Sequence, residues 1–109
     1  MTETLIDELN SYVRSISDVV MKLNANLPLS NKEVASFQVT CDQAITCVNQ
    51  IAGGAAILRL TDHTVKRSLV KMKRALDSIR NLPAHAAILK KVIEDNIEIL
   101  RQELRRELN

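Results

Sequence analysis

Hydrophobic residues recur every three or four positions along most of the chain, the spacing that gathers them on one face of an α-helix. In residues 3–25 they fill an arc of about 140° around the helix axis, and the opposite side is mostly charged. Asn24 and Asn26, followed by Pro28, end this predicted helix. Its apolar positions are Leu5, Leu9, Tyr12, Val13, Ile16, Val19, Val20 and Leu23.

A second helix is predicted over residues 31–52. Ser30 and Glu33 have the spacing of a capping box, in which each side chain bonds the backbone N–H of the other residue and so starts a helix. The consecutive glycines Gly53 and Gly54 are expected to stop it. The apolar face of this helix comprises Val34, Phe37, Cys41, Ala44, Ile45, Val48, Ile51 and Ala52.

The third helix has two possible starts. Its apolar stripe runs across Asp62 without interruption, which favours a single helix over residues 55–81 that ends before Pro83. The alternative is a shorter helix with Asp62 as its N-cap and residues 55–61 as a loop. The stripe consists of Leu58, Val65, Leu69, Met72, Leu76 and Ile79.

The fourth helix, residues 84–108, has an apolar face that Ile88 and Ile99 widen to nearly half the circumference, with Asn96 in its middle. In one alternative, a second copy of the chain covers the additional apolar surface, and Asn96 sets the register in which the two copies pair. In the other, all of this surface is buried within the monomer, and Asn96 forms its hydrogen bonds there. For self-association we predict Ile88, Val92, Asn96 and Ile99. The main face comprises Leu89, Val92, Ile93, Ile97, Leu100, Leu104 and Leu108.

Four such helices, joined by turns of two to five residues, predict an all-α, antiparallel, up-down-up-down four-helix bundle that forms a single domain over residues 1–109. Only Tyr12 and Phe37 are aromatic, so the core is expected to be aliphatic. No apolar run approaches the roughly 20 residues that a membrane span needs. The first residues are acidic and periodic, unlike a secretion signal, so a cytoplasmic location without membrane contact is expected.

The two cysteines, Cys41 and Cys47, are six residues apart and would lie about 120° apart around a helix, so they are not expected to pair. Free thiols fit a reducing compartment, and Cys41 on the apolar face reads as a small core residue. No metal-ligand cluster, phosphate-binding loop or catalytic triad accompanies them. The chain is therefore expected to have no enzyme activity, metal, cofactor or small-molecule substrate.

Basic residues concentrate between positions 59 and 80, which contain seven basic and only two acidic residues, although the whole chain carries a net charge of only +2. Such a field attracts an anionic partner. The expected partner is an acidic protein surface or a second copy of the chain; nucleic acid is the alternative, although no aromatic residue is interleaved for base stacking. The residues predicted to bind it are Arg59, Lys66, Arg67, Lys71 and Arg74.

His63 lies about 160° from the centre of the apolar stripe and is expected to face solvent. The sequence His63-Thr64-Val65-Lys66, with Ser68 two residues further on, resembles the His-Thr-Leu-Lys-Gly-Ser motif of histidine-phosphotransfer domains, which are also four-helix bundles. The resemblance implies that His63 accepts a phosphoryl group. It departs from the motif where the family has a small residue that lets a receiver domain approach, because Arg67 stands there.

Taken together, these patterns predict a non-catalytic helical-bundle interaction module, namely an adaptor, an assembly subunit or a small chaperone that forms a homo-oligomer. It would contact partners through the basic face of the third helix and the broad apolar face of the fourth. One alternative is a nucleic-acid-binding protein that uses the basic face of residues 59–80. The other is a histidine-phosphotransfer protein with His63 as the phospho-acceptor.

Overall fold

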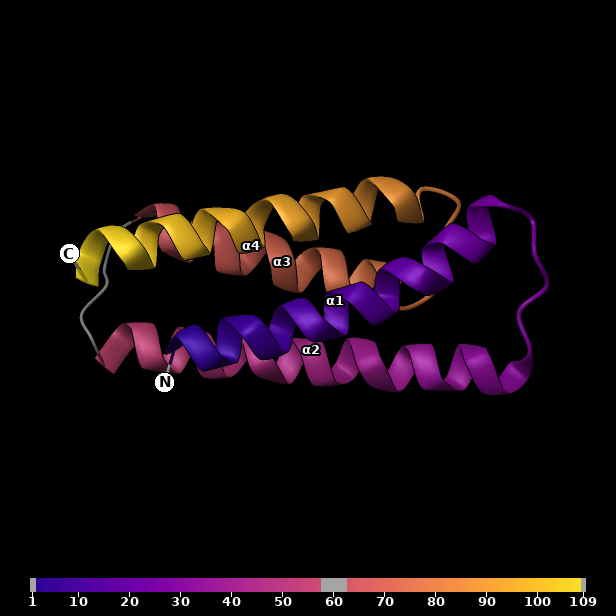
Figure 1. Ribbon diagram of the computed structural model, residues 1–109, viewed down its shortest axis with the longest axis horizontal. Helices are drawn as coiled ribbons and strands as arrows, with labels where there is room; N and C mark the ends of the chain where they lie inside the picture. The colour runs from indigo at the N-terminus through magenta and orange to yellow at the C-terminus, as the bar shows by residue number, and fades with distance from the viewer. Residues whose placement is uncertain (1, 58–62, 109) are drawn as a thin grey trace.

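Four helices, each antiparallel to the next, form the protein in the computed structural model, which describes residues 2–57 and 63–108 (Figure 1). The first, α1, packs against α2 and α4, and the third, α3, also packs against α2 and α4. This arrangement confirms the predicted all-α, up-down-up-down bundle, which measures 46 × 21 × 19 Å. The helices are α1 (Thr2–Asn24), α2 (Asn31–Ile57), α3 (His63–Ile79) and α4 (Ala86–Leu108).

An aliphatic core runs along the bundle, with Phe37 as its buried aromatic residue. Full burial of a Leu or Ile side chain contributes about 1.5–3 kcal/mol, so this core supplies most of the driving force for folding. Some positions differ from the predicted faces: Ala52 is exposed, whereas five residues outside the predicted faces are buried, namely Ile6, Cys47, Ser68, Ala75 and Ala86. None of the described helices is long and apolar enough to cross a lipid bilayer. The largest fully buried side chains include Leu9, Ile16, Ile51, Met72, Leu76, Ile79, Ile93 and Leu100.

The end of α1 is closed by Asn26, as predicted. Its φ of 56° is a left-handed conformation that asparagine tolerates better than most residues. The N–H of Asn26 donates to the Leu23 carbonyl at 3.1 Å, and the N–H of Leu27 donates to the Lys22 carbonyl at 3.0 Å. This pair of bonds is a Schellman motif, which satisfies carbonyls that the helix end would leave without partners.

The start of α2 is the predicted capping box. The Glu33 N–H donates to Ser30 Oγ at 3.1 Å, and the Ser30 N–H donates to Glu33 Oε1 at 3.4 Å. Lys22 Nζ lies 2.9 Å from Glu33 Oε2 and ties this corner to α1. The bonds from Lys22 first, and from Ser30 second, hold the pKa of Glu33 below its usual range. This stabilisation is therefore present above the ordinary carboxyl pKa and is lost as the pH falls through the lowered value.

The prediction that Gly53-Gly54 stops the second helix is wrong, because α2 continues through both glycines to Ile57. Glycine ends a helix when it adopts a positive φ, and neither glycine does so. A Cβ atom added to Gly53 would meet nothing within 4 Å, so no close neighbour requires glycine there. Glycine permits a break in the helix without causing one.

The predicted start of the third helix at residue 55 is also wrong, since α3 begins at His63 and residues 55–57 belong to α2. The shorter alternative has the correct start, although part of its predicted loop is helical; Leu58 and Asp62 lie outside the described residues. The apolar stripe in a sequence indicates which side of a helix faces the core. Two consecutive helices whose stripes are in phase therefore give the same hydrophobic periodicity as one longer helix. The fourth helix begins at Ala86, two residues later than predicted.

We expect Gly53→Ala to raise the free energy of unfolding by about 0.5–1 kcal/mol, because alanine restricts the unfolded chain and its Cβ has room in the helix. Urea denaturation measures the change. Ala52→Gly, at the preceding exposed helical position, is the matched control and should lower the stability by a similar amount. A Gly53→Ala variant less stable than the wild type would contradict a continuous α2.

We expect Ser30→Ala to lower the free energy of unfolding by about 1 kcal/mol, because the Glu33 N–H loses its acceptor. Thermal or urea denaturation followed by circular dichroism measures this loss. Ser11→Ala, at an exposed position in the middle of α1, removes the same hydroxyl without removing a cap and should leave the stability nearly unchanged. Equal effects of the two substitutions would show that the cap contributes nothing.

Candidate functional site

The outer face of α3 carries the basic residues that the sequence predicted for partner binding. The buried side of this helix includes Val65, Leu69 and Met72, which turns the cations outward. Arg59 lies outside the described residues, so the described surface consists of the other four. We call it the basic face; its members, all exposed, are Lys66, Arg67, Lys71 and Arg74.

The basic face lacks counter-ions in the described part of the chain. Arg67 and Lys71 are one turn apart, as are Lys71 and Arg74, and each like-charged pair of this spacing destabilises a helix by roughly 0.2–0.5 kcal/mol. An anion bound here would remove that repulsion. All ion pairs among the described residues use other cations, namely Lys22, Arg80, Lys90, Lys91, Arg101 and Arg106.

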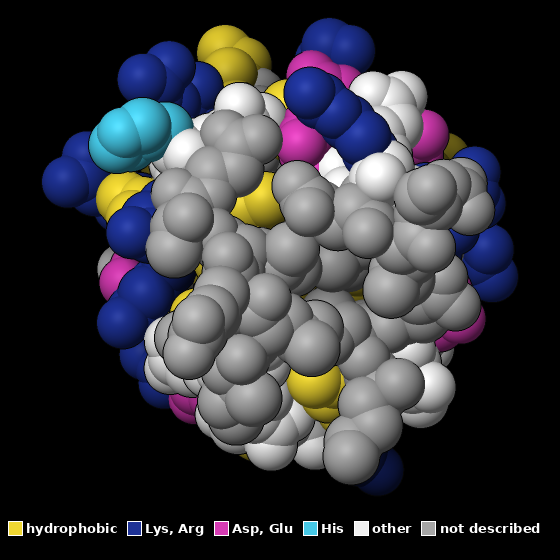
Figure 2. All heavy atoms as spheres, turned by 90° about the vertical axis from the view of Figure 1, so that its left-hand side faces the viewer, with side chains coloured by type: hydrophobic (Ala, Val, Ile, Leu, Met, Phe, Trp, Pro, Cys, Tyr) yellow, Lys and Arg dark blue, Asp and Glu magenta, His cyan; other side chains and the backbone are white. Residues whose placement is uncertain are grey.

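A shallow hollow of about 360 Å³ lies on the basic face, with the exposed Val70 among its lining residues. Val70 is 49% exposed, although most aliphatic residues of α3 are buried. Figure 2 shows Lys and Arg side chains gathered along one flank of the bundle, next to a histidine. Val70 was not among the residues predicted from the sequence, although it is an apolar residue off the stripe with cations three and four positions away. The lining is completed by His63, Lys66, Arg67, Lys71 and Arg74.

His63 is the first residue of α3 and is exposed, so it does not lie inside a longer helix as the predicted start at residue 55 implied. Arg67 lies one turn further on and lines the same hollow. The position that phosphotransfer domains keep small is therefore taken by a long charged side chain beside the imidazole. Within residues 2–57 and 63–108, no group of three His, Cys, Asp or Glu side chains is placed to hold a metal ion.

An ion pair shows how α3 is turned within the bundle. Arg80 follows the last turn of α3, its N–H donating to Leu76 O, and its Nε lies 2.9 Å from Oδ1 of Asp42 in α2. This edge of α3 therefore faces α2. At 100° per residue, Lys71 lies about 180° and Arg67 about 140° from Arg80 around the helix. These two cations consequently lie toward the edge of α3 that faces α4.

A second ion pair shows how α4 is turned. Arg101 Nη2 lies 2.9 Å from Oδ1 of Asp7 in α1, so this edge of α4 faces α1. Around the helix, Val92 lies about 180° and Ile99 about 160° from Arg101, which places both toward α3. Ile88, about 140° away, is on the same side and is 67% exposed. The two surfaces predicted separately, one basic and one apolar, therefore adjoin; we call Ile88, Val92 and Ile99 the apolar edge.

Asn96 does not share the apolar edge with the three other residues predicted for self-association. It is only 5% exposed, whereas Val92 and Ile99 are half-buried and Ile88 is mostly exposed. Its Nδ2 donates to the Val92 carbonyl at 2.7 Å, within the same helix. Asn96 is thus buried and bonded within its own helix.

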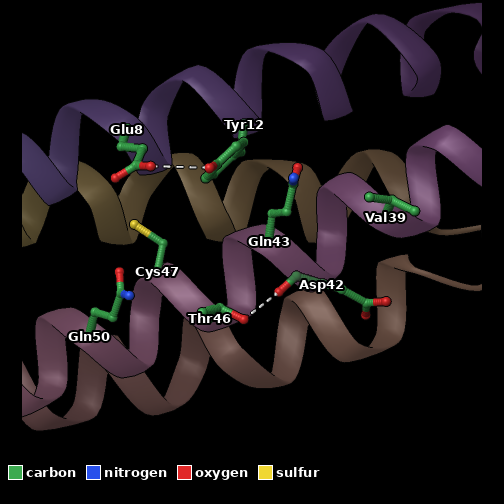
Figure 3. A pocket seen from close by; sticks show the side chains of 8 residues that line it. All are labelled: Glu8, Tyr12, Val39, Asp42, Gln43, Thr46, Cys47 and Gln50. Atoms are coloured by element: carbon green, nitrogen blue, oxygen red, sulfur yellow. Dashed lines mark hydrogen bonds between the residues drawn. The ribbon is translucent and has the colours of Figure 1, made fainter.

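A second hollow, of about 330 Å³, lies between α1 and α2. Figure 3 shows Glu8 and Tyr12 projecting into it from α1, with the Tyr12 hydroxyl donating to Glu8 Oε1 at 3.2 Å. Partial desolvation, and Glu8 to a lesser extent, raises the pKa of Tyr12. This groove was not predicted from the sequence, because its polar residues belong to two helices and each resembles an ordinary surface residue. The α2 residues that line it are Val39, Asp42, Gln43, Thr46, Cys47 and Gln50.

Both cysteines are buried and unpaired, which confirms Cys41 as a core residue and the absence of a bond to Cys47. Burial raises the pKa of Cys41 to about 12. Burial also raises the pKa of Cys47, whose thiol donates to the Leu5 carbonyl at 3.1 Å. Thiolate is the nucleophilic form of cysteine, so thiols with raised pKa values contribute packing in place of reactivity at neutral pH.

In comparisons with known proteins, no family model, curated protein or solved structure matches the chain. Its function is therefore inferred from the basic face and the apolar edge beside it.

Proposed function

We propose that this bundle is a non-catalytic interaction module that binds an acidic protein surface through the basic face of α3. The observation that supports this function is a cluster of four exposed cations on one face of a single helix, none of which makes an ion pair with any described residue. Such a module would serve as an adaptor, an assembly subunit or a small chaperone.

Partner carboxylates would satisfy this surface in two ways. They would cancel the repulsion between neighbouring cations of α3, and they would accept charge-assisted hydrogen bonds. Arg67 and Arg74 present guanidinium groups, which bind a carboxylate through two parallel hydrogen bonds, whereas Lys66 and Lys71 act as point charges. Because all four cations are exposed, this binding weakens as salt screens the charges.

Apolar groups on and beside the basic face favour a protein partner over nucleic acid. Val70 lies among the cations, and the exposed Ile88 belongs to the adjoining edge of α4. A protein surface can cover both aliphatic side chains, whereas a phosphodiester backbone offers them no apolar contact. Base stacking would need aromatic side chains, but Tyr12 and Phe37 are on α1 and α2.

We expect the double substitution Arg67→Glu/Arg74→Glu to weaken binding of labelled poly-L-glutamate by at least about tenfold at low salt, because it reverses half of the basic face. Fluorescence anisotropy at increasing salt concentrations measures the affinity and its salt dependence. His63→Gln should change the affinity little, since the proposed binding depends on the neighbouring cations.

Arg14→Glu/Lys32→Glu is the matched control, because it changes the net charge equally at exposed positions on α1 and α2. An equal loss of affinity in both double variants would mean that net charge alone drives binding, and the basic face would not be the site. Tighter binding of duplex DNA than of poly-L-glutamate at the same salt concentration would replace the protein partner by nucleic acid.

We also expect two copies of the chain to associate through the apolar edge, since Ile88 is 67% exposed beside Val92 and Ile99. Ile88→Glu should then shift sedimentation toward monomer without loss of helicity. Val39→Glu, at a 56% exposed position on α2, is the control and should leave the association unchanged. A wild-type protein that sediments as monomer at high concentration would rule out this contact.

A further inference from the structure

The apolar residue at the centre of the basic face indicates what kind of segment fits there. Val70 has Lys66 and Arg67 one turn before it and Arg74 one turn after it, and all four line the same hollow. A surface that attracts anions only by charge has no need of an exposed aliphatic group among its cations. Leaving Val70 49% exposed to water is unfavourable, and an apolar contact would remove that cost.

The spacing of these residues matches an α-helix in the partner. Along the axis of α3, Arg67 lies about 4.5 Å before Val70 and Arg74 about 6 Å after it. A second helix lying alongside repeats its own side chains with the same rise, so one apolar residue opposite Val70 would have residues three or four positions away opposite the arginines. Acidic residues at those positions would pair with Arg67 and Arg74.

The difference in length between Val70 and its neighbours favours a protruding side chain over a flat anionic surface. Val70 is much shorter than the lysine and arginine side chains that line the shallow hollow with it. The aliphatic stems of lysine and arginine add apolar surface below their charged ends. A bilayer surface or a row of phosphates would meet the charges first, whereas a leucine or phenylalanine side chain is long enough to reach Val70.

Resting on the proposed function, we infer that the partner segment is an acidic amphipathic helix. One large apolar side chain of that helix inserts over Val70, and carboxylates one turn before and after it bind Arg67 and Arg74. Charge brings the segment to α3, and the apolar insertion selects a helix whose apolar and acidic residues alternate with helical spacing.

Three short peptides of equal length test this inference against the full-length protein. The first is an amphipathic helix of Glu and Leu, the second has the same composition with its leucines scattered off any one face, and the third is all Glu. We expect the amphipathic peptide to bind at least about fivefold more tightly than the scrambled one and to gain helicity on binding. Val70→Ser should remove this preference, Val70→Ile should retain it, and the exposed control Val39→Ser should not alter it.

The outcomes separate this inference from the proposed function on which it rests. Equal affinity for the three peptides would overturn the helical partner and leave the charge-driven module standing. If none of the three peptides binds, both proposals are wrong. Binding to anionic lipid vesicles that depends on Val70 and exceeds binding to the amphipathic peptide would assign the hollow to a membrane surface instead.

Discussion

Burial of a nearly pure aliphatic seam is the constraint on which the rest of the structure depends. With a single buried aromatic side chain, the bundle relies on many Leu, Ile and Val contacts, and each helix must turn its stripe fully inward. Met72 of α3 and Ile93 of α4 are completely excluded from water. Once the stripe of α3 faces the core, its basic residues have no position other than the outer surface, so the seam that stabilises the fold also presents the candidate site.

Ion pairs complement this seam at the edges between helices. Lys22 pairs with Glu33 across α1 and α2, Arg80 pairs with Asp42 of α2, and Arg101 pairs with Asp7 across α1 and α4. Among the described residues, no ion pair bridges α3 and α4, although basic and apolar side chains line that edge. The boundary between α3 and α4, which has no ion pair among the described residues, is thus where the basic face and the apolar edge meet.

The hydrophobic period predicted the helices, their order and most of the core, because it depends only on which residues must avoid water. It did not predict the boundary between α2 and α3, because Gly53 and Gly54 can lie within a helix as well as at its end. The exposed cations of α3 were predictable because they lie opposite the apolar stripe. Their proximity to the apolar edge was not, because it depends on contacts such as that between Arg101 and Asp7, far apart in sequence.

The position of Tyr12 determines what the protein's own fluorescence can report. The chain has one tyrosine and no tryptophan, so Tyr12 dominates its intrinsic emission. Tyr12 lines the groove between α1 and α2 and donates to Glu8, away from the outer face of α3. The intensity of its emission would change when a ligand binds in that groove. It would stay constant when a ligand binds to the basic face, unless the bundle transmits the change through its core. The molecule therefore carries a built-in optical reporter on a side that the proposed partner does not touch.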